Sequence, residues 1–425
     1  MRPSILSSFL RRHGLPIKLR PQRPRYTSHL HDANSKPTAT QPFQVETYLE
    51  SSRQKFTSQP PTIIPDILSS THSHLLTLSL ADHVPSMFPP DHQLLLSKRS
   101  LLPSIHHSLP PPDEKDLVLP QGHHLVYFPL QLPPSQLMPD GTDPAHWPGP
   151  PFVRRMWAGG RVVFREGWRE LMRMDGRRVV CIERVVPDAV EVRTMKSAGV
   201  DREEKEEEEE EGMERVFVDV QRLYGAVPVG KGVVTDEEVG RGLLDGKGVA
   251  VEEARRLVFM RERRGLVKGI SARKVIKATA VPEFTFPLKP DNTLLFHFSA
   301  LTYNAHAIHI DPYYARYREG YPGLLVHGPL TLVLMLSALR AALVRLQSQA
   351  WPTTSTPEQS GWMPSVKSIT YRNLAPLFSN EDMRVCLRRT KPKGDDLSWH
   401  VWVEGPEGGI AVKGHAVSTG VVRPS

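Results

Sequence analysis

The stretch "HGPLTLVLMLSALRAALVRL", residues 327–346, predicts the central element of the fold. Gly328 lies at the expected helix cap and Pro329 in the first turn, where the missing N–H of proline costs nothing. The residues that follow are almost all apolar, so the helix lacks a polar face and must be enclosed on most sides, as when a curved sheet wraps around it. Arg340 and Arg345 mark where this helix returns to the surface.

The segments around this helix either alternate apolar and polar residues or are continuously apolar, and both patterns are typical of strands. "TLLFHFSALTYN" (293–304), just before the helix, is strand-like. Four more predicted strands follow the helix, spaced like an antiparallel meander: "VKSITYRNL" (366–374), "DMRVCLRRTK" (382–391), "LSWHVWVEG" (397–405) and "GIAVKGHAVST" (409–419). One long helix followed by successive strands predicts a sheet rolled round a helix.

Strands also dominate residues 120–225. The predicted strands are "HHLVYFPLQL" (123–132), "RVVFRE" (161–166), "RRVVCIERVV" (177–186), "DAVEVRTM" (188–195) and "ERVFVDVQRLYG" (214–225). We therefore expect one domain over residues 45–225, an irregular linker over 226–272 and a second domain over 273–425. Residues 201–212 hold a run of glutamates that repel one another, so we expect a disordered insertion there.

The basic charge of the chain is concentrated at its beginning. The net charge is +8, but residues 1–31 contain seven Lys or Arg and no Asp or Glu, and the remainder has 47 basic against 46 acidic residues. This balance argues against a nucleic-acid partner. An Arg-rich, Ser-containing, acid-free segment is typical of a mitochondrial transit peptide, so we expect residues 1–31 to direct the protein to the matrix. The chain has two cysteines, which fits a reducing compartment, and we expect no membrane span.

The polar stretch "LTYNAHAIHID" (301–311) is the candidate site. Polar groups beside an apolar stretch either satisfy one another in a turn or line a pocket, because an unpaired buried imidazole costs about 1–3 kcal/mol. The helix that begins near Gly328 presents free N–H groups and a partial positive charge. A histidine such as His309, facing these donors, suits removal of a proton alpha to a thioester carbonyl, with the helix terminus holding the oxyanion.

At these residues the sequence resembles the MaoC-like hydratase/dehydratase family of the hot-dog fold. The family pattern is roughly Leu-Ser-Gly-Asp-x-Asn-Pro-Ile-His-x-Asp, followed further along the chain by His-Gly. The variant "FSALTYNAHAIHID" (298–311) is similar to one branch, the mitochondrial type 2 hydroxyacyl-thioester dehydratases and the mesaconyl-C4-CoA hydratases. The resemblance extends upstream to 119–144 and 150–164, which look like the N-terminal domain of double hot-dog members. It implies an α+β double hot-dog fold, with two antiparallel sheets each wrapped round a central helix.

The resemblance also implies roles for particular residues. His309 falls on the catalytic histidine and Gly328 on the residue whose N–H polarises the thioester carbonyl. The family's catalytic Asp falls on Asn304 and its Asn on His306, and an amide is no general base. We therefore expect Asn304 to orient the substrate hydroxyl or a water, and His306 either to act as a second proton carrier or to hydrogen-bond locally.

Further candidates are expected to bind the substrate: Tyr303, His327, Arg154, Arg155 and Trp157. The two arginines would meet the phosphates of a pantetheine or CoA carrier or an acidic carrier protein, with solvated side chains as the alternative. Trp157 serves either as acyl-pocket wall or as close packing. Asp311 is interpreted as a helix cap for "YYARYR" (313–318). We expect no metal and no cofactor.

The implied function is dehydration of (3R)-3-hydroxyacyl thioesters to trans-2-enoyl thioesters in mitochondrial type II fatty acid synthesis, on acyl carrier protein. The alternatives are an enoyl-CoA or mesaconyl-C4-CoA hydratase and a non-catalytic module that binds acyl thioesters. The protein would be a monomer that mimics a dimer, or a homodimer. No cluster like that at His309 occurs in the N-terminal domain, which is expected to lend acyl-pocket surface.

Overall fold

The apolar helix predicted from the sequence is the longest helix of the fold. In the computed structural model, which describes residues 43–88, 118–194, 214–228, 234–262, 276–350, 364–391 and 394–420, helix α8 runs from Gly328 to Ala350. The N–H of Thr331 donates to the carbonyl of His327 at 3.0 Å, so His327 rather than Gly328 takes the cap position. Pro329 lies in the first turn, as predicted.

The burial of α8 follows its composition. Residues 330–339 are buried along their whole length, whereas Arg340 is half-buried and Arg345 is exposed, which confirms where the helix was predicted to reach the surface. By length and composition α8 is, within the described part of the chain, the one helix that could cross a membrane. Because 72% of its most apolar window is buried inside the protein, it is a core helix.

The strands that follow α8 form the C-terminal half of the sheet. They are β7 (Phe284–Leu288), β8 (Val366–Asn373), β9 (Met383–Arg389), β10 (Leu397–Glu404) and β11 (Ile410–Ser418). Their order is β8-β11-β10-β9-β7, and every pair is antiparallel. All four strands predicted after the helix are confirmed, and the last three form a meander.

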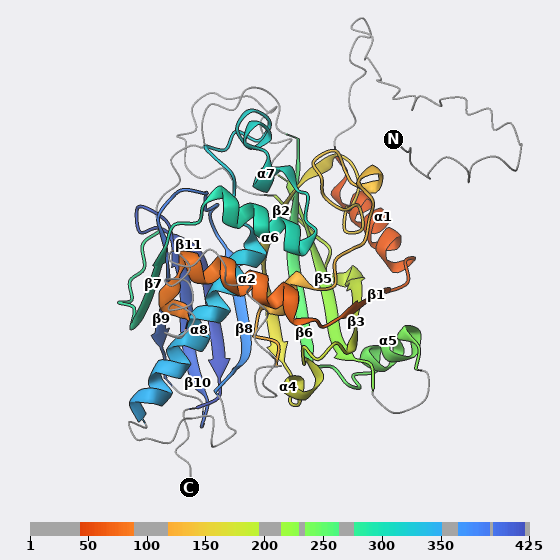
Figure 1. Cartoon of the computed structure of the whole chain (residues 1–425). Coiled ribbons are helices and arrows are strands. Elements are labelled where there is room, and N and C mark those ends of the chain that lie inside the picture. The colour runs from red at the N-terminus through yellow and green to blue at the C-terminus, as the bar shows by residue number, and fades with distance from the viewer. Residues whose placement is uncertain are drawn as a thin grey trace, which may run out of the picture. The chain divides into compact units, whose positions relative to one another are not determined.

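The N-terminal half of the sheet is built from β1 (Thr62–Ile67), β2 (Phe152–Phe164), β3 (Arg178–Val185), β4 (Glu191–Thr194), β5 (Glu214–Ala226) and β6 (Val251–Arg261). The order is β1-β3-β5-β6-β2, with β4 paired to β5. Strand β2 pairs with β8 from Gly159↔Arg372 to Val163↔Ser368, so both halves share one continuous sheet (Figure 1). The α+β double hot-dog fold is confirmed, with the two sheets joined edge to edge.

The outer edges of this sheet are β1 and β7, and each carries a proline, Pro65 and Pro287. Proline has no N–H to give to a ladder, and within sheets it is confined mostly to edge strands, strand ends and bulges.

Short helices complete the fold, and all elements named here belong to one compact unit, residues 44–425. The α-helices are α1 (Val45–Thr57), α2 (Ser70–His83), α4 (Trp168–Leu171), α5 (Asp236–Leu244), α6 (Asn292–Thr302) and α7 (Ala307–Ile310). The 3-10 turns are η1 (Pro85–Met87), η3 (His123–Val126), η4 (Pro134–Gln136) and η5 (Pro187–Ala189), and η7 (Tyr314–Arg318) is a π-helix. Helices α2 and α6 pack together on the side of the sheet where α8 lies (Figure 1).

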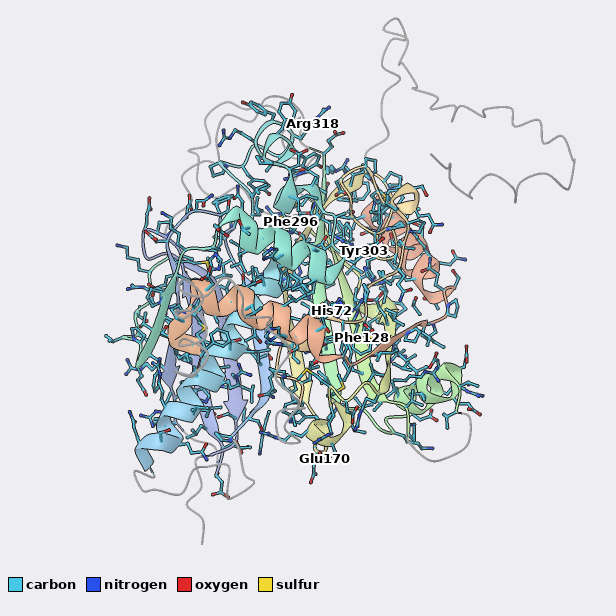
Figure 2. All side chains as sticks on the ribbon, in the orientation of Figure 1. His72, Phe128, Glu170, Phe296, Tyr303 and Arg318 are labelled. Carbon is cyan, nitrogen blue, oxygen red and sulfur yellow. The ribbon has the colours of Figure 1, made fainter. Side chains whose placement is uncertain are left out.

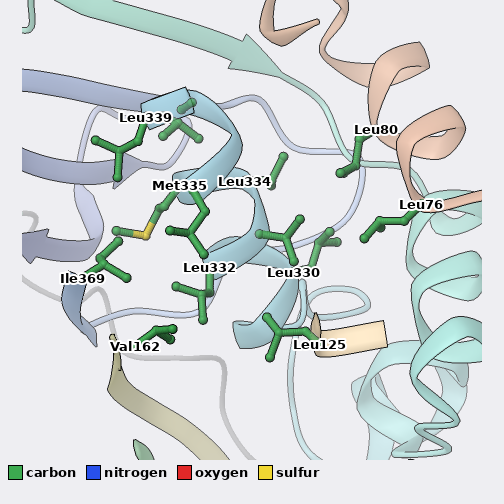
Figure 3. Close-up of a cluster of buried hydrophobic side chains, with 14 of the residues drawn as sticks. Leu76, Leu80, Leu125, Val162, Leu330, Leu332, Leu334, Met335, Leu339 and Ile369 are labelled. Atoms are coloured by element: carbon green, nitrogen blue, oxygen red, sulfur yellow. The ribbon is translucent and has the colours of Figure 1, made fainter. Parts of the chain in front are cut away.

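Helix α8 contributes to the core on two sides. Leu330 and Leu334 point toward Leu76 and Leu80 of α2 (Figure 3). Other side chains of α8 point toward residues of β2 and β8, namely Leu332 toward Val162 and Met335 toward Ile369. All of these side chains are fully buried. Burial of one such side chain stabilises the fold by about 1.5–3 kcal/mol, so α8 holds both halves of the chain together.

Two strand predictions were wrong. Residues 293–304 form helix α6 and its end, because the Asp291 carboxylate caps the helix by accepting the Leu294 N–H at 2.8 Å. Its buried residues Leu294, Leu295 and Phe298 follow a helical period that the aromatic content obscured. Residues 123–132 begin with η3, and the N–H of Phe128 donates to the Asp66 carboxylate at 2.7 Å rather than to a neighbouring strand.

The range 226–272, expected to be an irregular linker, contains α5 and β6. Helix α5 begins with a capping box between Thr235 and Glu238, and β6 pairs with both β2 and β5. The N-terminal half of the sheet therefore extends to Arg261. The predicted transit peptide (1–31) and glutamate-rich insertion (201–212) lie outside the described residues.

Candidate active site

A tight turn connects α6 to α7 and holds the polar residues of the predicted site. Tyr303 ends α6 in a left-handed conformation, with φ of 53°, and its side chain is 58% exposed (Figure 2). The N–H of Asn304 donates to the Ser299 carbonyl at 2.9 Å. The side-chain oxygen of Asn304 accepts the N–H of His306 at 3.0 Å, which is an Asx turn. The amide oxygen of Asn304 is thus used by the backbone, and its NH₂ group remains for other contacts.

His309 lies on α7, and its ring is held in one orientation. Its Nδ1 lies 2.8 Å from the carbonyl oxygen of Leu325. A carbonyl only accepts, so Nδ1 carries the proton and the lone pair of the neutral ring is on Nε2. The ring stacks on that of His327 with 3.7 Å between centroids and 22° between planes. Because Gly328 follows His327, this imidazole lies beside the first turn of α8.

Burial keeps His309 neutral near pH 7. The side chain is 8% exposed, and loss of hydration lowers its pKa to about 4. The hydrogen bond to the Leu325 carbonyl acts in the opposite direction, and the charge of Arg155 adds to the lowering. A neutral imidazole with a free Nε2 is able to accept a proton.

Two further histidines surround His309. His327 is fully buried, and its Nε2 lies 2.8 Å from the Ser299 hydroxyl, so α6 and α8 are connected at this point. The Nδ1 of His327 has no hydrogen-bond partner among the described residues. His306 packs edge-on against His309 with 5.4 Å between ring centroids. Burial lowers the pKa of both rings well below the usual value.

A loop of the N-terminal half packs directly on this turn. The carbonyl of Asp140 accepts the N–H of Ala307 at 2.8 Å, and its Oδ2 lies 3.5 Å from Nε2 of His306. Gly141 is so close that a Cβ there would lie 2.0 Å from the carbonyl oxygen of Ala305. Both halves of the chain therefore build the candidate site.

Strand β2 approaches the start of α8 just as closely. A Cβ on Gly328 would lie 2.9 Å from Cβ of Trp157 and 3.0 Å from Nδ2 of Asn373. The carbonyl of Trp157 accepts the Asn373 amide at 2.8 Å, and its indole N–H donates to the Tyr371 hydroxyl at 2.8 Å. Trp157 thus packs on the helix terminus, and contact with an acyl chain remains a prediction.

The two predicted arginines are engaged within the chain. Nε of Arg154 donates to Glu319 at 2.7 Å, and NH1 of Arg155 donates to Asp143 at 2.7 Å. Arg155 is close enough to the histidines to lower the pKa of His306 and His309. A contact of either guanidinium with carrier phosphates stays a prediction.

Asp311 caps the following segment, as interpreted from the sequence. Its carboxylate accepts the N–H groups of Tyr313 and Tyr314 at 2.8 and 3.0 Å. Across the described ranges, no group of three or more His, Cys, Asp or Glu is arranged to hold a metal ion.

Three residues of the site were missed in the sequence. Ser299 lies inside the stretch that resembles the family and was interpreted as part of a strand. Asp140 lies in a turn-rich loop, "PDGTDPAHWPGPP" (139–151), whose only signal was the upstream resemblance. Asn373 lies at the end of β8 and gave no signal.

The sequence is similar to known proteins over most of this region. A model of the family "Hydroxyacyl-thioester dehydratase type 2" matches residues 122–224 and 221–379. A mesaconyl-C(4)-CoA hydratase of Chloroflexus aurantiacus is 29% identical over 300 residues, which cover 70% of this chain and 82% of that protein. A mitochondrial hydroxyacyl-thioester dehydratase type 2 of Schizosaccharomyces pombe is 24% identical over 283 residues, 65% of this chain and 80% of that protein.

Among solved structures, a MaoC-like dehydratase of Phytophthora capsici has a TM-score of 0.44 and 14% identity, covering 86% of this chain and 98% of that one. The family match spans more than half of the chain and includes the histidine turn, the start of α8 and the loop that packs on them. The chain belongs to the hydroxyacyl-thioester dehydratase type 2 family.

Proposed function

We propose that this protein dehydrates (3R)-3-hydroxyacyl thioesters to trans-2-enoyl thioesters on acyl carrier protein, in mitochondrial type II fatty acid synthesis. As a family member, the chain is a hydro-lyase of the dehydratase/hydratase type that acts on acyl thioesters. The finer assignment is supported by the Schizosaccharomyces pombe relative, whose name describes a mitochondrial dehydratase. The stacking of His309 on His327, at the first turn of α8, is the observation on which the chemistry rests.

The proposed reaction begins with proton abstraction by His309. Its neutral Nε2 takes the proton from the carbon alpha to the thioester, and negative charge develops on the thioester oxygen. The N–H of Gly328, at the positive end of α8, stabilises that charge. The electron pair forms the double bond, the bond between Cβ and the hydroxyl breaks, and the departing oxygen takes the proton back from His309 as water is released.

Other predicted residues receive supporting roles in this proposal. The NH₂ group of Asn304 orients the substrate hydroxyl or the water, and His306 lies beside His309 to contact the same oxygen. Tyr303, His327 and Trp157 would line the acyl site. Arg154 and Arg155 would exchange their carboxylate contacts for carrier phosphates.

The second candidate is hydration of an enoyl-CoA or mesaconyl-C4-CoA, the same chemistry in the other direction. It is favoured by the Chloroflexus aurantiacus relative, which is 29% identical. A non-catalytic module that binds acyl thioesters is the third candidate, because Asn304 replaces the carboxylate of the family pattern.

A spectrophotometric assay with crotonyl-CoA tests the proposal. We expect loss of the enoyl absorbance with the wild-type protein and a decrease of about 10²–10⁴-fold in His309→Ala, the usual contribution of an acid–base residue. His415→Ala is the matched control, because His415 is exposed on β11. Absence of turnover together with intact acyl-thioester binding would favour the module.

Two further measurements test the finer assignment. A higher kcat/KM with acyl carrier protein than with CoA substrates supports the synthesis role, and the reverse order supports the CoA hydratase. Import of the full chain into isolated mitochondria with removal of a segment near residue 31 would support the location, and failure of import would contradict it.

A further inference from the structure

The family pattern places a catalytic Asp where this chain has Asn304, yet a carboxylate is present at the site. It belongs to Asp140, in the N-terminal half of the chain. Its Oδ2 lies 3.5 Å from Nε2 of His306. The two side chains are 10% and 9% exposed, so the pair is almost closed to solvent. Catalytic hydrogen bonds are often longer before substrate binds and shorten afterwards.

The Asp140 carboxylate is fixed by its own loop. Its Oδ1 accepts both the N–H and the hydroxyl of Thr142, at 2.9 and 2.7 Å. Its backbone carbonyl accepts the N–H of Ala307, the residue that follows His306. The close approach of Gly141 to Ala305 holds the loop against the turn on the other side. With Oδ1 occupied, Oδ2 is the oxygen that faces His306.

We propose that Asp140 is a positioning residue that acts through His306, supplying from the N-terminal half the carboxylate that Asn304 does not provide. A carboxylate only accepts, so Nε2 of His306 carries the proton and Nδ1 of the neutral ring is an acceptor. In this tautomer, Nδ1 accepts a hydrogen bond from the 3-hydroxyl of the substrate and orients the leaving oxygen. This inference rests on the proposed function and names how the leaving group is held.

His309 carries the proton during elimination of water. The proton from the alpha carbon moves to Nε2 of His309, its electron pair forms the double bond, and the Cβ–O bond breaks. The leaving oxygen keeps its own proton, which points at His306, and takes the second proton from His309 to become water. The Asp140 carboxylate stabilises positive charge that develops on the imidazoles during the transfer.

The other charged groups around His306 are distributed on several elements. His309 lies on α7, Arg154 and Arg155 on β2, and Asp143 on the same loop as Asp140. Both arginines disfavour a charged His306 and Asp143 favours it, while burial is the largest influence. His306 is therefore neutral near pH 7, which the orienting role requires.

The central test replaces the carboxylate by an amide of the same size. In Asp140→Asn, the amide is able to donate to Nε2, which favours the wrong tautomer of His306. We expect kcat for crotonyl-CoA hydration to fall by about 10²–10³-fold with little change in KM, since loss of a tautomer-fixing carboxylate acts on the chemical step. Asp188→Asn is the matched control, because Asp188 is exposed in η5 of the same half.

A double variant separates positioning from a structural role. If Asp140 acts through His306, Asp140→Asn combined with His306→Ala is about as slow as His306→Ala alone, because effects within one unit are not additive. If the loss of kcat in the double variant equalled the product of the losses in the two single variants, the inference would be overturned. So would an Asp140→Asn variant with wild-type kcat.

Nitrogen-15 NMR of histidine-labelled full-length protein gives a readout independent of turnover. The His306 signals are assigned by their loss in His306→Ala. We expect Nε2 of His306 to be protonated in the wild type and to lose that proton, wholly or partly, in Asp140→Asn. An unchanged Nε2 chemical shift in Asp140→Asn would overturn the pairing of Asp140 with His306. Absence of turnover in the wild type would contradict the proposed function, and the NMR result would still test the pairing.

Discussion

At the scale of residues, environment separates the buried histidines into two groups. Six are buried in the described part of the chain: His123, His124, His146, His306, His309 and His327. His146 lies between Asp143 and Glu183, at 3.2 and 3.0 Å, and despite its burial these carboxylates raise its pKa to about 9. The other five have a pKa lowered mainly by burial, to about 4 for His124 and His309. The three rings of the candidate site, His306, His309 and His327, are thus neutral near pH 7, while His146 is charged.

These shifts predict how stability depends on pH. A histidine that is neutral when folded takes up its proton first in the unfolded chain, so stability falls as pH falls from about 6.5 toward 4, by about 1.4 kcal/mol per pH unit for each extra proton. His146 contributes the opposite dependence: its stabilisation is complete below pH 6.5 and is lost as pH rises through 9. For these histidines together, we expect the free energy of unfolding to be highest near pH 6.5.

Urea unfolding of the wild type and His309→Gln, measured between pH 6.5 and 5, checks this prediction. The variant lacks one buried titrating ring, so its stability should decrease less steeply with falling pH. His415→Gln, on the exposed side of β11, should keep the wild-type slope. Equal slopes in all three proteins would contradict the assignment for His309.

At the scale of elements, the start of α8 depends on close packing from three directions. Ser299 of α6 contacts His327, Trp157 of β2 lies against Gly328, and Asn373 of β8 connects Trp157 to the same point. The helix terminus is thereby fixed relative to His309, which stacks on His327. Such fixed geometry is what an oxyanion site requires, because its donors must be in place before charge develops.

Gly328→Ala tests this packing. The added Cβ would meet Trp157 and Asn373 at 2.9–3.0 Å, so we expect a loss of about 1–3 kcal/mol in the free energy of unfolding, as for other overpacked sites, and lower kcat. Gly323→Ala is the control, because a Cβ there has no neighbour within 4 Å. Urea unfolding and the crotonyl-CoA assay report the two effects. If Gly328→Ala and Gly323→Ala had the same stability and the same kcat, the close packing of Trp157 and Asn373 on Gly328 would be unimportant.

At the scale of the whole molecule, the N-terminal half of the chain contributes directly to the candidate site. Its loop brings Asp140 and Gly141 to the turn between α6 and α7, and its strand β2 brings Trp157 to α8. The sheet pairing between β2 and β8 holds these contacts in register. The site is therefore a product of both halves.

Gly141→Ala tests the contribution of the N-terminal half. Alanine would be strained at φ of 83°, and its Cβ would displace the loop from Ala305. Since small misplacements of a site cost about 10²-fold in rate, we expect kcat/KM to fall by about this factor. Gly246→Ala carries similar strain at φ of 78° but has no neighbour within 4 Å, so it should lose stability without losing activity. Equal activity in the two variants would contradict the prediction.

What the sequence predicted correctly was local. The composition of residues 327–346 was enough to identify the core helix, whereas the roles assigned to residues 301–311 stay predictions. Helix α6 was missed because its capping residue, Asp291, lies outside the apolar run that resembled a strand. Asp140 was missed because only the fold brings it to His306, and no sequence spacing encodes a contact between distant loops.

The two prolines at the margins of the sheet, Pro65 and Pro287, have a consequence for behaviour at high concentration. A strand from another molecule that docked on either margin would find an incomplete row of amide donors. Growth of the sheet from one copy to the next is thereby disfavoured, which protects a long, eleven-stranded surface from polymerising.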